Sequence, residues 1–104
     1  MSFCVPVLLD GNYEIQGLFS AKTTAGDVVV VTEKGPRFTS FIEAISTALQ
    51  GQQVIGFVEL DMPDFASAVA QLLTMDPSLR SSAIFIQDTE PLFDDLIAYF
   101  RSLA

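Results

Sequence analysis

The chain has 104 residues, half of them hydrophobic, which is enough length and apolar content for one domain with a continuous core. Thirteen acidic residues against five basic ones give a net charge of −8, which argues against direct binding to nucleic acid phosphates. The single cysteine excludes an internal disulfide, and the absence of histidine excludes the ordinary Ser-His-Asp and Cys-His catalytic arrangements.

The first third of the chain predicts an antiparallel β-meander. Strands are expected at residues 3–9, 13–20 and 28–32. Pro6 removes a hydrogen-bond donor from the first strand and therefore predicts an edge position for it. Cys4 in the same strand is expected to be a small buried side chain. Four consecutive valines, residues 28–31, predict a strand that is covered on both faces.

The stretch KGPRFTSFIEAIS, residues 34–46, predicts the joint between the meander and the first helix. Its Lys-Gly-Pro beginning indicates a turn. Ser40 followed by Glu43 fits a capping box, and the apolar residues that follow recur at helical spacing. A helix is therefore expected over residues 40–50, with Gly51 as its stop.

The rest of the chain predicts strands at residues 53–60 and 82–88, each followed by a helix. Asp61 is expected to cap the first of these helices, and Pro91 lies near the start of the second. The strand–helix–strand unit over residues 53–88 predicts a right-handed parallel crossover. The order β-β-β-α-β-α-β-α indicates an α/β (α+β) fold in a single domain, residues 1–104. We expect one mixed sheet with helices packed on it.

Four carboxylates would follow the ends of the two later strands, and oxygen ligands of this kind can hold Mg²⁺ or Ca²⁺. They are Glu59, Asp61, Asp88 and Glu90. Local helix capping by Asp61 and by Asp88 or Thr89, with Glu90 in a first turn, explains the same residues without a metal. We favour capping and expect no catalytic residues, metal or cofactor.

The last helix predicts a wide apolar face, which a domain of this size either buries completely or leaves uncovered in part. We expect Tyr99, Phe100 and Leu103 to bind a protein partner or, in a homodimer, a second copy. Residues 53–104 carry eight acids and two bases, against five and three in residues 1–52, so this half is the acidic pole. A small basic spot of Lys22, Lys34 and Arg37 could meet the acidic pole of another copy.

The leading interpretation is a non-catalytic protein-interaction domain that uses the apolar patch of the last helix with its acidic surround. One alternative is a small acidic inhibitor or immunity-type protein that presents carboxylates to a basic groove of its target. The carboxylates concerned are Asp61, Asp64, Asp88, Glu90, Asp94 and Asp95. A divalent-metal-dependent enzyme is the remaining alternative.

The compartment is expected to be the cytoplasm. The first eleven residues contain no Lys or Arg, and their apolar stretch ends at the charged residue Asp10. A signal peptide is therefore not expected. The longest uncharged stretch, residues 44–58, is interrupted by polar side chains and is shorter than the roughly 20 apolar residues of a membrane span.

The chain resembles the N-terminal domain of the bacterial SseB (enhanced serine sensitivity) family. The resemblance rests on Val5-Pro6-Val7 in a first strand, a meander, Phe38-Thr39-Ser40 at the opening of a helix and a strand–helix–strand–helix tail. It departs from the family at Gln87-Asp88, where Asn-Pro is expected. The resemblance implies an accessory α/β domain without an established reaction. It also implies that Phe38 is a core anchor and that Thr39-Ser40 starts the helix.

Overall fold

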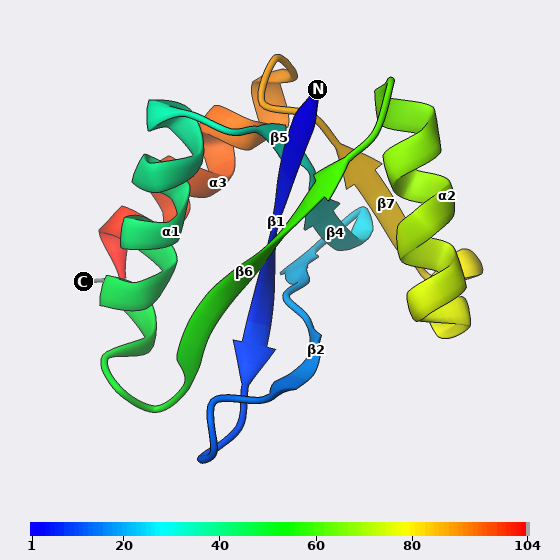
Figure 1. Ribbon diagram of the computed structural model, residues 1–104. Helices are drawn as coiled ribbons and strands as arrows, with labels where there is room; N and C mark the ends of the chain where they lie inside the picture. The colour runs from blue at the N-terminus through cyan, green and yellow to red at the C-terminus, as the bar shows by residue number, and fades with distance from the viewer. Residues whose placement is uncertain (104) are drawn as a thin grey trace.

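The strands form a central layer between two layers of helices in the computed structural model, which describes residues 1–103 (Figure 1). The strands are β1 (Ser2–Leu9), β2 (Ile15–Leu18), β3 (Ala21–Thr23), β4 (Gly26–Val30), β5 (Thr32–Glu33), β6 (Val54–Asp61) and β7 (Ala83–Ile86). The helices are α1 (Pro36–Leu49), α2 (Phe65–Met75), the short 3₁₀ helix η1 (Pro77–Arg80) and α3 (Pro91–Ser102). Helices α1 and α3 cover one side of the strands, and α2 covers the other. None of the helices in the described residues has the length and apolar character needed to cross a membrane.

The predicted α/β class, with a strand-rich first third followed by α-β-α-β-α, is confirmed, but the strands are divided between two sheets rather than one. In the first sheet β1 pairs antiparallel with β6 along its whole length and, on its other side, with β5 and then β2. In the second sheet β4 pairs antiparallel with β3 and parallel with β7. The parallel pair makes this second sheet mixed.

Two nearly continuous segments of the chain join the sheets. Only Phe19 and Ser20 separate β2 from β3, and only Val31 separates β4 from β5. The backbone stays hydrogen-bonded across both breaks, because the Phe19 amide donates to the Pro6 carbonyl (3.0 Å) and the Val31 amide donates to the Ile86 carbonyl (2.9 Å). Each of these two segments, β2–β3 and β4–β5, therefore passes from one sheet into the other without a loop.

The edge position predicted from Pro6 is wrong, because β1 is the central strand of its sheet. Pro6 directs its backbone toward the β2 and β5 side, where Phe19 donates to its carbonyl. It lies between the part of β1 that pairs with β5 (Phe3 and Cys4) and the part that pairs with β2 (Val7–Leu9). The missing amide hydrogen falls in this gap, so no ladder hydrogen bond is lost.

The parallel crossover predicted over residues 53–88 is also wrong. Strand β6 lies in the first sheet, whereas β7 pairs in parallel with β4 in the second. The connection between the two parallel strands therefore contains β5, α1, β6 and α2.

The starts of α1 and α2 differ from those predicted, whereas Pro91 lies at the start of α3 as predicted. Helix α1 begins four residues early, with Gly35 at the N-cap and Pro36 in its first position, so Ser40 and Glu43 lie inside the helix and form no capping box. Proline suits this position because the first helical amide needs no partner within the helix. The predicted stop is confirmed: α1 ends at Leu49, and Gly51 has a φ of 80°.

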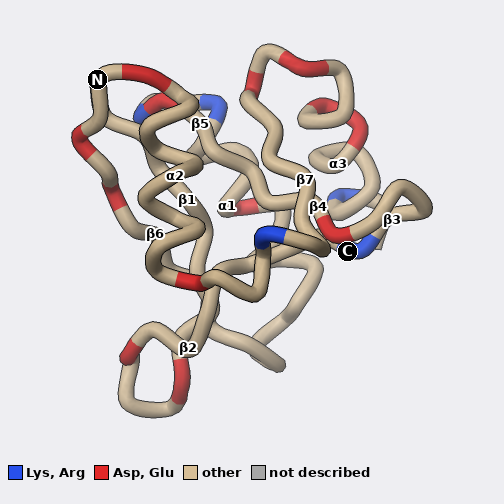
Figure 2. Tube along the Cα trace, turned by 90° about the vertical axis from the view of Figure 1, so that its right-hand side faces the viewer, with Lys and Arg blue, Asp and Glu red and all other residues tan. Residues whose placement is uncertain are grey.

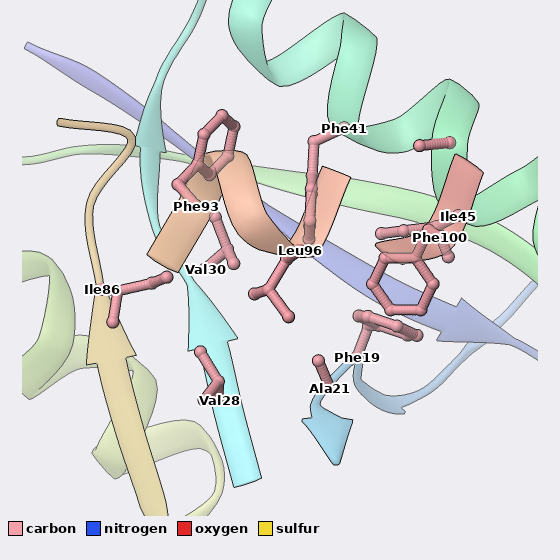
Figure 3. Close-up of a cluster of buried hydrophobic side chains, with 11 residues drawn as sticks. Phe19, Ala21, Val28, Val30, Phe41, Ile45, Ile86, Phe93, Leu96 and Phe100 are labelled. Carbon is pink, nitrogen blue, oxygen red and sulfur yellow. The ribbon is translucent and has the colours of Figure 1, made fainter. Parts of the chain in front are cut away.

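Each helical layer has its own hydrophobic core. The aromatic core lies under α1 and α3 (Figure 3) and consists of Phe19, Ala21, Val28, Val30, Phe41, Ala44, Ile45, Ile86, Phe93, Leu96 and Phe100. The α2 core consists of Phe3, Val5, Val29, Val31, Ala68 and Leu72. The four valines of residues 28–31 alternate between the two cores, which confirms the prediction of a strand covered on both faces.

Candidate functional site

Two of the three apolar residues predicted to face a partner are exposed, Tyr99 on α3 and Leu103 at its C-cap. Tyr99 is 54% exposed and Leu103 is 52% exposed. Phe100 is only 8% exposed, and its ring lies 5.8 Å from the ring of Phe19 and 6.2 Å from that of Phe41. Phe100 therefore belongs to the aromatic core (Figure 3), and the prediction that it faces a partner is wrong.

A shallow depression of about 490 Å³ lies beside Tyr99. Its lining combines α3 with the β3–β4 hairpin and consists of Lys22, Thr23, Thr24, Asp95, Leu96 and Tyr99. Asp95 is exposed, as predicted. We call Tyr99, Leu103 and Asp95, with this depression, the α3 patch. Helical spacing indicated the contribution of α3, but the hairpin joins the surface only through tertiary folding.

Two of the predicted acidic residues bind Arg37 within the molecule. The Nη2 atom of Arg37 donates to Asp94 Oδ1 at 3.0 Å and to the backbone carbonyl of Asp88 at 2.6 Å. The Asp88 carboxylate lies 3.6 Å from Arg37 Nε. The guanidinium also lies over the ring of Phe93, 5.0 Å from its centroid. This Arg37 cluster ties the start of α3 to α1, so neither carboxylate is an isolated charge.

Glu90, Asp61 and Asp64 each have a local partner at the end of a helix or strand. Glu90, at the N-cap position of α3, accepts a hydrogen bond from the Gln87 amide at 2.7 Å. Asp61 does not cap a helix as predicted; it ends β6 and lies 3.6 Å from the N-terminal amine. The cap of α2 is Asp64, whose Oδ1 accepts from the Ser67 amide at 2.8 Å. These hydrogen bonds from Ser67 lower the pKa of the Asp64 carboxyl.

The predicted acidic pole is therefore divided. Figure 2 shows one group of acidic positions at the start of α3 and another beside β6 and α2, with basic positions near β5 between them. The predicted basic spot is also divided, because each of its members pairs with a different acid. Lys22 lies 2.9 Å from Asp27, and Lys34 lies 3.2 Å from Glu59.

The four carboxylates considered as metal ligands have separate partners. Glu59 pairs with Lys34, and Asp61 lies near the N-terminal amine. Asp88 belongs to the Arg37 cluster, and Glu90 binds the Gln87 amide. Within residues 1–103 no group of three or more Asp, Glu, Cys or His side chains is placed to hold a metal ion.

A second surface feature, which the sequence did not indicate, is a groove between α1 and the first sheet. This β6 groove has a volume of about 360 Å³ and is lined by Cys4, Lys34, Gly35, Phe38, Thr39, Ile42 and Phe57. Phe38 is buried, as the resemblance to the SseB family implied, and its ring meets that of Phe57 at 5.4 Å. Phe57 itself is 54% exposed. The period-2 alternation of β6 could have placed Phe57 on this face, had the covering helix been known.

The Cys4 thiol at the floor of the β6 groove is free and buried. Burial raises its pKa, the nearby Glu59 carboxylate raises it further, and the Lys34 ammonium lowers it in part. The thiol form is therefore favoured, which is the opposite of what a nucleophilic cysteine requires.

No family model, curated protein or solved structure matches this chain. The resemblance to the SseB family therefore stays a prediction, and the function is argued from the surfaces described above.

Proposed function

We propose that this chain is a non-catalytic, cytoplasmic protein-interaction domain that binds a protein partner through the α3 patch. One observation carries the proposal. The face of α3 that includes Phe93, Leu96 and Phe100 is buried, yet Tyr99 and Leu103 continue the apolar surface of the helix into solvent. Large exposed aromatic side chains beside a depression are typical of interaction sites.

The chemistry of the remaining surface supports binding rather than catalysis. The Cys4 thiol is buried and has a raised pKa, and Asp64, Asp88 and Asp94 are used in a helix cap and in ion pairs. A free thiol is also typical of a reducing compartment such as the cytoplasm. The net charge of −8 disfavours nucleic acids as partners.

The structural details favour the α3 patch over the acidic inhibitor. An inhibitor of a basic groove needs unpaired carboxylates on one surface, whereas Asp88 and Asp94 are bound to Arg37. Asp61 and Asp64 belong to the other group, beside β6 and α2. The acidic surround of the α3 patch is therefore reduced chiefly to Asp95.

The test is affinity capture from the native lysate with the double variant Tyr99→Ser/Leu103→Ser. The control is Tyr13→Asn, which removes another exposed aromatic residue, 74% exposed, from the β1–β2 turn. Asparagine is chosen because Tyr13 has a φ of 62°, which asparagine tolerates better than most residues. We expect a protein that the wild type and Tyr13→Asn retain and that the double variant loses, while all three keep the same melting temperature.

Washing at low and at high salt separates the two kinds of interface. A partner held by the α3 patch survives the high-salt wash, since screening acts on exposed charges and leaves apolar contact largely intact. A partner lost only at high salt and retained by the double variant would instead support the acidic inhibitor. Loss of folding in the double variant would show that Tyr99 and Leu103 stabilise the domain itself.

A further inference from the structure

Strand β6 is a long edge strand. All eight of its residues pair with β1, and no strand in the described part of the chain pairs with its other side. In Figure 1, β6 lies in front of β1 with α1 on one side and α2 on the other. The view turned by 90° places β6 at the margin of the molecule (Figure 2). Its free edge is therefore accessible to another chain.

The register shows which backbone groups this edge presents. The Met62 amide donates to the Met1 carbonyl, so the even-numbered residues of β6 face β1. By the two-residue period of an antiparallel ladder, Ile55, Phe57, Glu59 and Asp61 direct their amides and carbonyls away from β1. An unpaired edge of this kind is a template for a further strand unless charges or covering elements block it.

Phe57 lies near the middle of this outward-facing set, and its ring is largely exposed at the rim of the β6 groove. Its ring contacts that of Phe38 and is still 54% exposed, so much of it remains available for a further contact. The charged residues of the strand, Glu59 and Asp61, are confined to one end of it. The middle of the edge is therefore apolar.

We propose that β6 pairs with β6 of a second copy, antiparallel and about a twofold axis at Phe57. In this register Phe57 lies opposite Phe57, which gives an aromatic cross-strand pair. Glu59 lies opposite the second copy's Ile55, and Asp61 lies opposite the second copy's Gln53. No two like charges face each other. A register centred on Glu59 would place two carboxylates opposite each other, which disfavours it.

This dimer uses a surface separate from the α3 patch and therefore goes beyond the proposed function. It joins the first sheets of the two copies into one continuous sheet, and the free edge of β6 in each copy is covered by β6 of the other. The interface is isologous, as expected for a closed dimer, and leaves no further edge on β6 for growth. It also has a distinctive salt response. Each copy carries a charge of −8, so screening by salt should strengthen the dimer.

The first test is the molar mass in solution, measured by light scattering and sedimentation over a range of concentrations. We expect twice the mass of one chain for the wild type. Phe57→Lys and Glu59→Pro should each raise the dimer dissociation constant by at least ~10-fold, equivalent to about 1.4 kcal/mol. Proline at residue 59 removes an amide that faces away from β1, so the ladder with β1 is kept. Tyr99→Ser/Leu103→Ser is the control and should dimerise normally.

The second test reports the register directly. In a Cys4→Ala background, Phe57→Cys places two thiols opposite each other, with Cα atoms about 5.5 Å apart, within disulfide range. Oxidised glutathione should link the copies of this variant. Glu59→Cys is the matched control, because its two thiols would lie about 14 Å apart along the strands and stay unlinked.

A wild type that stays monomeric at all concentrations and salt levels would overturn the proposal. So would a dimer that Phe57→Lys and Glu59→Pro leave intact, or one that the α3 control abolishes. Equal linking of Phe57→Cys and Glu59→Cys would overturn the register. Amide hydrogen exchange of the wild type tests the same interface without any variant, and so applies even if a variant does not fold. The Phe57 and Glu59 amides should exchange more slowly as the protein concentration rises.

Discussion

The hydroxyl of Thr32 is fully buried and has no hydrogen-bond partner in the described residues. Thr32 is the cross-strand partner of Cys4, so the two side chains lie on the same face of the first sheet. A buried hydroxyl without a partner costs free energy, because it has lost its hydrogen bonds to water. The side chain of Thr32 therefore fills space in the folded chain, while its hydroxyl makes no hydrogen bond within residues 1–103 that stabilises the fold.

Thr32→Val should raise the free energy of unfolding by about 1 kcal/mol, because the methyl group keeps the shape and removes the unpaired hydroxyl. Urea denaturation followed by circular dichroism measures the change. Thr32→Ala is the control, and it should not stabilise the protein, since it also removes a buried methyl group. A less stable valine variant would show that the hydroxyl has a partner, such as an ordered water molecule.

At the scale of single elements, the order of the three α-helices and of the longer strands was predictable, but the short elements β3, β5 and η1 and the starts of α1 and α2 were not. Asp61 and Asp64 could both cap α2, and local pattern does not choose between them. For α1 the local signal was Gly35-Pro36, which the apparent capping box at Ser40 and Glu43 obscured. The earlier start places Phe38 inside the helix, where its ring packs on that of Phe57.

The candidate site was predictable to a similar extent. Apolar residues at helical spacing placed Tyr99, Phe100 and Leu103 together on α3. Which of them is covered depends on where Phe19 and Phe41 lie, and these come from distant parts of the chain. The β6 groove was missed for the same reason, since its two walls, α1 and β6, meet only in the folded chain.

The cap of α2 gives a prediction with a defined pH dependence. Asp64→Ala should lower the melting temperature by a few degrees at neutral pH, because the Ser67 amide loses its acceptor. The folded state lowers the pKa of this carboxyl below its ordinary value of 3.8. Its stabilisation is therefore complete above that ordinary value and is lost as the pH falls through the lower folded value.

The matched control is Asp64→Asn, which keeps a cap acceptor and does not titrate. Thermal melts of the wild type and this variant should differ by an amount that shrinks as the pH falls below the ordinary carboxyl value. A difference that stays constant throughout the acid range would contradict the link between the charge of Asp64 and the cap.

At the scale of the whole molecule, strand pairing was the least predictable feature. Consecutive strands were expected to be neighbours, yet β1 pairs with β6 and β4 pairs with β7. Pro6 gave a misleading signal, because the residue lies in a gap between two partners of a central strand. These pairings depend on contacts between distant segments, which local periodicity does not encode.

The buried Cys4 thiol gives a prediction for global stability at high pH. Its pKa is raised in the folded state from an ordinary value of 9.0, chiefly by burial. The stability linked to this group is complete below the ordinary value and is lost as the pH rises through the higher folded value. The free energy of unfolding of the wild type should therefore fall more steeply above pH ~9 than that of Cys4→Ala.

Urea denaturation of both proteins between pH ~8 and ~10.5 provides the measurement. The tyrosine and lysine residues are common to the two proteins, so the difference between them isolates the thiol. Parallel curves would show that Cys4 ionises with the same pKa in the folded and unfolded states.

The valine run that serves both cores also determines where the chain can change its length during evolution. Val28 and Val30 face the aromatic core, whereas Val29 and Val31 face the α2 core. Inserting or deleting one residue here would exchange the two sets and disturb both cores at once. The exposed turn at residues 24–25 has no such constraint, so insertions should accumulate there, while the length of residues 26–33 should stay fixed.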